Sequence, residues 1–575
     1  NNSGERVTEQ WKKSGNNWYY LDGNGEMAID QLIEDGDNYY YVDINGVMAA
    51  NQWVAIENEN AGEDDEPDQN WYYFQANGKA LKNGDNSKVA LKTINGKKYA
   101  FDDEGKMLWG WVKEDDPTHI DNTEGDGFKE GDYYFGASDD GAMTVGWIQL
   151  DITYDEAESN DDYKYTAAAF TDDEDQSRWF YFKSNGKKIQ ADSSNAERTK
   201  DKTINGKKYA FDEYGAMVAE WSLDEDDLKK NGAGYRDGVT ATTSTALLAT
   251  NSDGVAVNKG AGTDAKYSQS WKYFNSVEDG SRVSKGWFKV VAAEYLNAGK
   301  YDDDEDAWYY ADGSGNLYAG EFKTIKGKKY AFRNDGRMVD GLKFIKENKA
   351  AQSLTVYADD DSANPFDNED DFLESATRFY EGAGYQCYYF GGGDDGAMRT
   401  GKVTVSIDGE NKNFYFEKSG GSKGAGRTGE KDDKIYQSGL LLQAGSDEKY
   451  QVVKKTTHYV VDYADGKVDY VTYEKLDDAE DFMKASNVTA ADAIKGATGN
   501  TKVDIGNISK NADDLKEAYN ISIAKPAATD STSYDYVLVN TSGKIVDKKG
   551  KSKDGNDYYY VTTSKGVITG IYVED

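Results

Sequence analysis

Short aromatic segments separated by polar turns recur along most of this chain. In WYYF, which begins at Trp71, successive side chains of an extended strand point to opposite faces. Trp71 and Tyr73 therefore share one face, and Tyr72 and Phe74 share the other. The residues that follow are rich in Asn, Asp and Gly, which favour tight turns. This pattern predicts β-hairpins and not helices.

One hairpin sequence is repeated almost without change, which makes repetition the first feature to settle. KTINGKKYAFDDEGKM begins at Lys92, and close copies begin 110 and then 121 residues later, at Lys202 and Lys323. Looser copies fill the intervals, and seven of the eight Met residues lie two positions after a Gly. We predict that each copy is one hairpin, with a strand over 98–101, a turn containing Gly105 and a return strand from Met107. Where copies are adjacent, as from Met27 to Met48, the period is 21 residues.

The repeats predict two regions. Residues 1–445 are expected to form an all-β array of hairpins interrupted by acidic insertions, since strand patterns and polar runs alternate there. Residues 446–575 are expected to form a small α+β unit. In that unit we predict strands and a turn at Asp465-Gly466 within 446–475, helices within 476–519, and a final pair of strands formed by YVLVNTSGKIV and YYYVTTSKGVITGIYV. The expected insertions are 57–69, 114–132, 151–176, 223–269, 293–306 and 347–386.

Composition narrows the class of partner. The 575 residues exceed what one hydrophobic core supports, and aromatic residues make up 13% of them. The net charge of -38 would repel a phosphate backbone, which argues against nucleic acid as a partner. No run approaches the ~20 apolar residues of a membrane span. The chain opens at NNSGERVTEQW without Met, so we interpret it as a mature form that has lost an export signal, although a shortened chain would look the same.

The two faces of each aromatic strand suggest different roles. The Tyr/Phe face, as in Tyr72 and Phe74, persists in every strong copy, so we assign it to the core. The Trp/Tyr face, as in Trp71 and Tyr73, varies between copies and is our candidate for ligand contact. The alternative is that these aromatic rings only pack one hairpin on the next.

At this point the motifs carry a resemblance. The order G-W, then W-Y-Y, then N-G-x-M resembles the cell-wall-binding repeats of choline-binding and glucan-binding proteins from Gram-positive bacteria. INGKKYAF is similar to the repeats in the carbohydrate-binding tail of large clostridial toxins. The resemblance covers residues 9–445 apart from the insertions. It implies a β-solenoid of stacked hairpins, an extracellular location on the cell surface, and binding of cell-wall polymer or host glycan.

The resemblance also implies where a ligand would bind. In the choline-binding branch, a G-W Trp and a Trp and Tyr from neighbouring hairpins form an aromatic cage that attracts a quaternary ammonium group. Sugars use the same rings through stacking. In all three KKYAF copies the cage positions are lost, as at Lys98 and Ala100, so consecutive intact cages are not expected. The matching positions are Trp18, Tyr20, Trp53, Trp71, Tyr73, Trp111, Trp147, Trp179, Tyr181, Trp221, Trp271, Tyr273, Trp287, Trp308 and Tyr310.

Signals for catalysis are weak. The chain has two histidines, His119 and His458, and we found no nucleophile, zinc-protease or phosphate-loop motif. We therefore expect a protein that is not an enzyme and needs no cofactor. Clustered carboxylates at Asp302, Asp304 and Asp306 are candidates for Ca²⁺, with solvated charge as the alternative.

Two functions of different classes fit these observations. The first is a non-catalytic extracellular protein that binds cell-wall polymer or glycan through aromatic hairpin faces. The second is a structural subunit of an extracellular assembly, or an adhesin, whose inserted loops contact a host protein or a further copy of the chain. The KKYAF copies and the insertions favour the second, and the intact Trp/Tyr hairpins favour the first.

Overall fold

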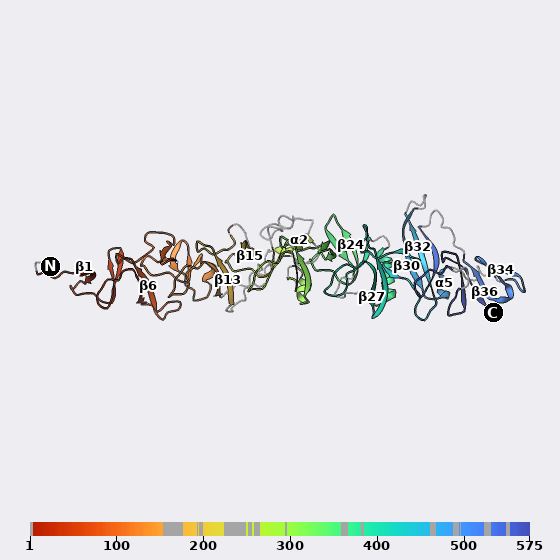
Figure 1. Cartoon of the computed structure of the whole chain (residues 1–575), viewed down its shortest axis with the longest axis horizontal. Helices are drawn as coiled ribbons and strands as arrows, with labels where there is room; N and C mark the ends of the chain where they lie inside the picture. Colours follow the sequence, from red (N-terminus) through yellow and green to blue (C-terminus); the bar gives the residue numbers. More distant parts are fainter. Residues whose placement is uncertain are drawn as a thin grey trace. The chain divides into compact units, whose positions relative to one another are not determined.

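The chain forms two compact units built mainly from short antiparallel strands (Figure 1). The first unit comprises Asn1–Ala261, Gln269–Asp306 and Ala311–Leu317, and the second comprises Gly262–Ser268, Ala307–Tyr310 and Tyr318–Asp575. Strands predominate and the helices are few and mostly short, so the all-β prediction is confirmed. The computed structural model describes residues 4–152, 176–192, 194, 199–223, 249–250, 256–257, 265–293, 296–357, 366–380, 384–460, 467–486, 494, 496–521, 531–547 and 552–575.

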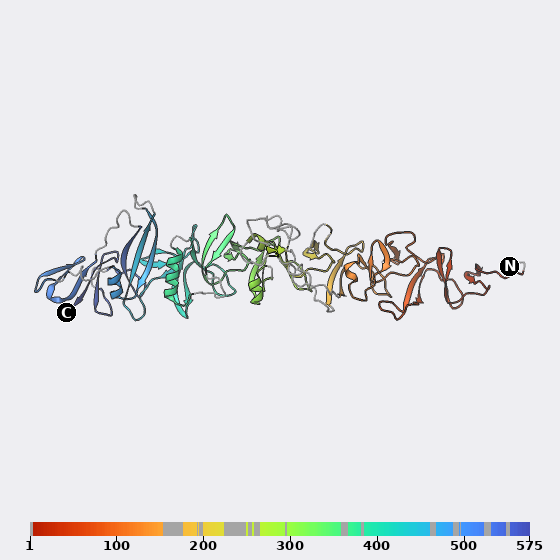
Figure 2. The same ribbon diagram turned by 180° about the vertical axis from the view of Figure 1, so that it is seen from behind.

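In the first unit most strands pair with the next strand along the chain, and Figure 2 shows these hairpins from behind. The pairs β9/β11 and β16/β19 instead flank an insertion. The short elements of this unit include η1 (Gly127–Lys129) and α3 (Ala298–Asp302). Its strands are β1 (Gln10–Ser14), β2 (Asn17–Leu21), β3 (Gln31–Asp35), β4 (Asn38–Val42), β5 (Gln52–Glu57), β6 (Gln69–Phe74), β7 (Lys92–Ile94), β8 (Lys97–Tyr99), β9 (Trp111–Lys113), β10 (Asp116–His119), β11 (Tyr133–Tyr134), β12 (Gly146–Ile152), β13 (Gln176–Phe182), β14 (Lys200–Ile204), β15 (Lys207–Phe211), β16 (Glu220–Leu223), β17 (Ala249–Thr250), β18 (Ala256–Val257), β19 (Trp271–Phe274) and β20 (Gly286–Val290).

The remaining strands form hairpins and then wider sheets. β27, β28, β31, β30 and β29 make a sheet of five strands, and β32 lies between β33 and β37. The helices from here on are α4 (Glu369–Tyr380), α5 (Ala479–Ala485) and η5 (Ala512–Asp514), and α2 (Ala265–Gln269) precedes β19. The strands are β21 (Ala307–Ala311), β22 (Glu321–Ile325), β23 (Lys328–Phe332), β24 (Leu342–Asn348), β25 (Ser353–Val356), β26 (Gln386–Tyr389), β27 (Gly401–Ile407), β28 (Glu410–Phe416), β29 (Gly429–Lys431), β30 (Lys434–Gln437), β31 (Leu440–Leu441), β32 (Tyr450–Tyr459), β33 (Val468–Leu476), β34 (Lys502–Ile505), β35 (Ile508–Asn511), β36 (Leu515–Asn520), β37 (Thr532–Asn540), β38 (Ser552–Lys553), β39 (Tyr558–Thr562) and β40 (Ile568–Glu574).

Each repeat contains two different turns. Asn95 and Gly96 join β7 to β8, and both have positive φ, at 49° and 85°, as a two-residue hairpin turn requires. In the second turn Asp102 Oδ1 accepts hydrogen bonds from the backbone N–H groups of Glu104 and Lys106, at 3.0 and 2.8 Å. Our prediction of the hairpin was therefore wrong in its main pairing: the strand ending at Tyr99 pairs with the segment before it. Beyond Gly105 the return is short, with a bridge from Phe101 to Met107 and a hydrogen bond from the Leu108 N–H to the Ala100 carbonyl oxygen.

One backbone hydrogen bond links each hairpin to the hairpin before it. The N–H of Met107 donates to the carbonyl oxygen of Trp71 in the preceding hairpin, at 2.8 Å. Met48 bonds to Trp18 in the same way at 2.9 Å, and Met217 bonds to Trp179 at 2.8 Å. In the second unit Met338 bonds to Trp308 at 2.7 Å. Because the bond is made by the backbone, it also forms where another residue replaces the Met. At Lys188 the backbone N–H donates to the carbonyl oxygen of Asp132 at 2.8 Å.

The Gly that precedes each Met has a packing role as well as a conformational one. Gly46 has φ of 76°, and a Cβ placed there would lie 2.8 Å from Sδ of Met27 in the preceding hairpin. Gly141 makes the same close approach to Met107, and in the second unit Gly396 makes it to Met338. The Gly-x-Met pattern thus records a contact in which the Met of one hairpin lies under the Gly of the next.

Both faces of the aromatic strand pack against neighbouring hairpins: the Tyr/Phe face is buried and the Trp/Tyr face is half-buried. Tyr72 and Phe74 pack towards Tyr39 and Tyr41 of the preceding hairpin. On the opposite face, Trp71, Tyr73 and Trp53 pack against Tyr99 and Phe101 of the following hairpin. The assignment of the Tyr/Phe face to the core is therefore confirmed at Tyr72 and Phe74, whereas the Trp/Tyr face packs in part on the next hairpin, and its role in ligand contact stays a prediction.

The C-terminal segments differ from our expectation in three places. β37 pairs with β32, while β39 pairs with β40, so the two last segments do not pair as one final hairpin. A helix forms at α5, but the end of the range 476–519, where we expected a second helix from Ser509, forms β35, η5 and β36, because β36 pairs with β40. The predicted turn at Asp465-Gly466 lies outside the described residues.

The repeat turn continues beyond residue 445. Asn540 Oδ1 accepts hydrogen bonds from the N–H groups of Ser542 and Lys544, both at 3.0 Å. The N–H of Ile545 donates to the carbonyl oxygen of Asp433 at 2.8 Å, as the repeat Met residues do to earlier hairpins. The boundary that we placed at residue 445 stays a prediction.

We predict that Gly141→Ala lowers the free energy of unfolding by about 2 kcal/mol, because the new methyl group would be forced into Met107 and the backbone would be strained. Urea unfolding followed by tryptophan fluorescence would measure the loss. Gly96→Ala is the control, since Gly96 also has positive φ but has no atom within 4 Å of the added carbon. It should cost about 1 kcal/mol. Equal losses in the two variants would contradict the packing role of the Gly-Met contact.

Candidate functional site

Five aromatic clusters among the described residues of the first unit share one geometry. Each has a G-W-type Trp, or Trp11, lying edge-on to a Tyr of its own hairpin and against an aromatic ring of the next. Trp53 lies 5.2 Å from Tyr73 and 4.9 Å from Tyr99, between ring centroids. The other clusters are Trp11 with Tyr20 and Tyr40, Trp111 with Tyr134 and Phe180, Trp147 with Tyr181 and Tyr209, and Trp221 with Tyr273 and Phe288.

These clusters are closed. Edge-to-face rings with centroids near 5 Å are in mutual contact. The Trp147 cluster repeats the spacing of the Trp53 cluster, with 5.1 Å to Tyr181 and 4.9 Å to Tyr209. The rings thus occupy the place in which the resemblance implied an open cage, and a ligand would have to meet the outer side of the cluster.

The KKYAF hairpins separate the clusters. Ala100 is fully buried against Tyr133 and Phe135 of the next hairpin, without a Trp in that interface. Ala210 packs in the same way against Phe274. Small residues in one hairpin therefore receive large rings from the next. The Trp111 and Trp147 clusters do occupy consecutive interfaces, but the interface on the Ala side of a KKYAF hairpin has no such cluster at Ala100 or Ala210.

The predicted ligand-binding residues fall into two groups by exposure. Trp111, Trp221 and Trp271 are at most 3% exposed, and Tyr310 is 9% exposed, so packing accounts for their rings. Trp18 is 40% exposed, and the remaining positions are half-buried. The half-buried positions are Tyr20, Trp53, Trp71, Tyr73, Trp147, Trp179, Tyr181, Tyr273, Trp287 and Trp308.

Three indole groups, those of Trp11, Trp179 and Trp308, donate their N–H to a carboxylate. Trp11 Nε1 donates to Asp35 at 3.1 Å, and Trp179 Nε1 donates to Glu278 at 3.0 Å. In the second unit Trp308 Nε1 donates to Asp394 at 2.8 Å. The buried Trp221 instead donates to the backbone carbonyl of Val291. Sequence reasoning missed these carboxylates, because they come from turns distant in the chain.

The Trp111 interface holds an internal cation in addition to its rings. Lys188 stands where other repeats have Met, and its Nζ lies 5.2 Å from the ring centroid of Trp111 and donates to the carbonyl of Phe128 at 2.5 Å. Burial lowers the pKa of Lys188 to about 7. Burial likewise raises the pKa of the Asp212 carboxyl to about 7. The chain therefore places its own amine against the Trp111 ring.

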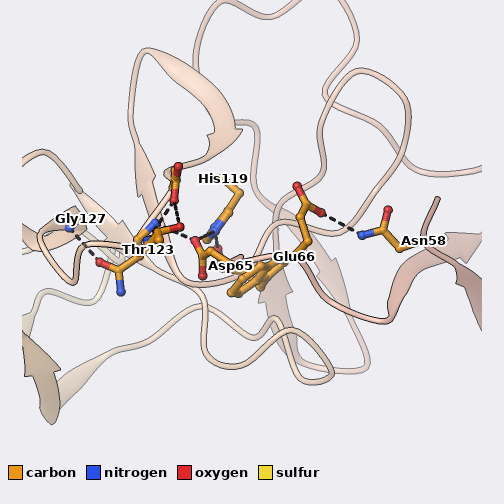
Figure 3. Close-up of polar contacts among 9 residues, drawn as sticks. Asn58, Asp65, Glu66, His119, Thr123 and Gly127 are labelled. Carbon is orange, nitrogen blue, oxygen red and sulfur yellow. Dashed lines mark hydrogen bonds and ion pairs between the residues drawn. The ribbon is translucent and has the colours of Figure 1, made fainter. Parts of the chain in front are cut away.

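Two insertions of the first unit are joined by polar contacts (Figure 3). His119 Nε2 lies 2.8 Å from Asp65 Oδ2, and its Nδ1 lies 2.9 Å from the carbonyl oxygen of Trp109. Asp65 also accepts a hydrogen bond from the backbone N–H of Asn122 at 2.6 Å, and the His119 ring stacks on Trp109 at 3.8 Å. These contacts connect the loop after β5 with the loop after β10. The role of His119 that they support is to hold the two loops together.

Other candidate sites gain no support. Within the described ranges no group of three or more His, Cys, Asp or Glu residues is placed to hold a metal ion, and the Ca²⁺ site at Asp302, Asp304 and Asp306 stays a prediction. Cys387 is buried, and burial raises the pKa of its thiol. No helix in the described part of the chain is long and apolar enough to cross a membrane.

We predict that Lys188→Met raises the free energy of unfolding at pH 7 by about 1 kcal/mol or more, because it removes a buried amine and restores the repeat residue. The folded state binds fewer protons at Lys188 than the unfolded state does, so the stability of the parent protein should rise as pH increases from about 7 towards 10.5. This rise should flatten in the variant when unfolding is measured across that range.

The matched control is Lys187→Met, which removes a partly exposed lysine paired with Glu114 at 2.6 Å. Its effect should stay within about 1 kcal/mol, as for other surface ion pairs. A Lys188→Met protein that keeps the parent pH dependence would show that Lys188 is not the buried amine responsible for it.

Comparison with known proteins adds to this geometry. Residues 2–53 match the Choline-binding repeat family, and residues 68–80 match the family described as "Putative cell wall binding repeat". Glucosyltransferase-S of Streptococcus mutans serotype c (strain ATCC 700610 / UA159) is 27% identical over 329 residues. That match covers 54% of this chain but 18% of the relative, so the chain spans less than a fifth of the relative's length.

Similar solved structures come from Streptococcus pneumoniae. Choline binding protein F is 18% identical with a TM-score of 0.24, covering 76% of this chain and 100% of that protein. CbpJ is 16% identical with a TM-score of 0.27, covering 75% and 99%. With TM-scores this low, these structures say nothing about the geometry of this chain, and the similarity to the family comes from the sequence matches. These matches confirm the predicted resemblance: the chain carries cell-wall-binding repeats of choline-binding type at residues 2–53 and 68–80 and is similar over 329 residues to a glucosyltransferase.

Proposed function

We propose that this chain is a non-catalytic extracellular protein of a Gram-positive cell surface, whose hairpins stack into a β-solenoid and bind cell-wall polymer or glycan. The matches to choline-binding and cell-wall-binding repeats support binding as the function of this region. The relative named a glucosyltransferase supports a glycan as the ligand class.

The observation that carries the proposal is the group of half-buried indole rings at hairpin edges. Trp71, Trp179 and Trp308 each occupy the first position of a WYY or WFY motif, and each keeps part of its ring exposed. A half-exposed indole presents a large apolar surface and loses little conformational entropy on binding. The closed clusters beneath these rings hold them in position, so they supply the rigid platform and not the ligand cavity.

Alanine at Trp71, Trp179 and Trp308 together should abolish retention of the protein on intact Gram-positive cell walls. Each lost ring should weaken binding about tenfold, equivalent to about 1.4 kcal/mol. A sedimentation pull-down would measure the retained fraction, once in Ca²⁺ and once in EDTA, to show whether the candidate Ca²⁺ site affects retention. Soluble dextran and choline would serve as competitors.

Tyr301→Ala is the control variant, because Tyr301 is 48% exposed and lies in α3 outside the clusters. Circular dichroism would establish that all variants are folded. A parent protein that is not retained on walls, or a triple variant that is retained as well as the Tyr301→Ala protein, would contradict the proposal.

A structural role is the second candidate. The contact of His119 with Asp65 holds two insertions together, and a fixed pair of loops is suited to protein contact. In this alternative the chain is a subunit of an extracellular assembly, or an adhesin, and its loops meet a host protein or another copy. Particles larger than the monomer in analytical ultracentrifugation, without wall retention, would favour this role.

A further inference from the structure

The exposed turn of one hairpin reaches the Trp179 ring of a hairpin two positions earlier. Glu278 lies in the turn that follows β19, and Trp179 lies in β13. Glu278 Oε2 accepts the indole N–H of Trp179 at 3.0 Å, and Oε1 accepts the amide N–H of Gln149 at 3.2 Å. Trp179, Gln149 and Glu278 therefore form one surface group, which we name the Trp179 rim.

The hairpin between these two also contributes to the surface. Lys207 follows the tight turn of the β14/β15 hairpin, and its Nζ lies 3.5 Å from Oδ1 of Asp279. Asp279 is the neighbour of Glu278. Both side chains are largely exposed, at 60% and 45%. Three consecutive hairpins thus place an aromatic ring, an amide, two carboxylates and an amine on one part of the surface.

The same arrangement recurs with the period of the KKYAF hairpins. In the second unit Trp308 Nε1 donates to Asp394, which lies in the GDDG turn after β26, again two hairpins further along the chain. In the first unit Lys97 of the β7/β8 hairpin lies 3.5 Å from Asp140 of the corresponding turn after β11. The repeating unit is therefore a set of three hairpins, and a short turn in the middle one leaves the Trp and the acidic turn on either side of it.

The chemistry of the Trp179 rim points to a sugar and not to a quaternary ammonium ion. An ammonium cage needs several ring faces around one space, whereas Trp147 is in contact with both Tyr181 and Tyr209, at 5.1 and 4.9 Å between centroids. The half-exposed indole instead offers one ring surface. Glu278 and Gln149 are exposed, and each carboxylate oxygen keeps a further lone pair that can accept from a hydroxyl group.

We propose that the Trp179 rim binds a pyranose unit of a neutral glycan, with the apolar side of the sugar on the indole and its hydroxyl groups bonded to Glu278 and Gln149. The equivalent site in the second unit is formed by Trp308 and Asp394. This inference rests on the proposed function and gives it a ligand class and residues outside the aromatic motif. One site for every three hairpins suits a polymer with repeated sugar units, because linked sites bind such a ligand with avidity.

The test is a titration of the full-length protein with fluorescently labelled dextran, a neutral glucose polymer, followed by anisotropy. Glu278→Ala and Asp394→Ala should each weaken binding about tenfold, and the double variant should weaken it further, since each loses a charged hydrogen-bond acceptor. Asp103→Ala is the matched control, because Asp103 is an exposed turn carboxylate in the β7/β8 repeat. It should bind dextran as the parent protein does.

The possible outcomes separate this inference from the proposed function. Parent protein that binds dextran equally well after Glu278→Ala and Asp394→Ala overturns the rim site but leaves glycan binding intact. Retention on cell walls that choline displaces and dextran does not also overturns the inference while leaving wall binding. Parent protein that binds neither cell walls nor dextran overturns both. Loss of dextran binding in the carboxylate variants, with binding kept in Asp103→Ala, supports the site.

Discussion

The structure depends on one backbone hydrogen bond made between neighbouring hairpins. In unit one it joins Met107 to Trp71, and the same bond recurs wherever a repeat turn meets the preceding strand. An isolated two-stranded hairpin is marginal in water, so each hairpin needs a neighbour on both faces. The hydrogen bond fixes how neighbours meet, and the Gly-Met contact beside it admits no larger residue at the Gly.

This constraint explains the aromatic composition. Because a hairpin has no core of its own, its rings serve the interface before it and the interface after it. Rings on Trp53 and Tyr73 meet Tyr99, while small Ala100 accepts the larger rings of the next hairpin. Aromatic content is thus a requirement of stacking first, and only rings at the edges remain available for other contacts.

Local turns were predicted in part: the turn containing Gly105 was predicted, whereas the hairpin turn at Asn95-Gly96 was missed, although turn chemistry is local. Asn95-Gly96 and the Asp102 turn can be predicted from the residues that form them. The face assignment was right for the buried Tyr72 and Phe74, but alternation could not show that the next hairpin packs on the Trp/Tyr face, because it shows which side chains share a face and not what lies against them. The helix expected at 509–520 failed because β36 pairs with the end of the chain, and tertiary pairing overrides helical spacing. The carboxylate at Trp179 was missed since Glu278 is 99 residues away in the chain.

The three-hairpin period has a consequence for how such a chain can change in length. Insertions occupy the first and third hairpins of a set, as at β5/β6 and β9/β11, while β7/β8 keeps a two-residue turn. Removing one hairpin would join two hairpin faces that do not match. Two faces with large rings would then meet, or Ala100 would lie against another small residue. Removing a whole set would restore every match of large and small surfaces. The natural unit of duplication, deletion or grafting in this protein is therefore the triplet of hairpins and not the 21-residue repeat.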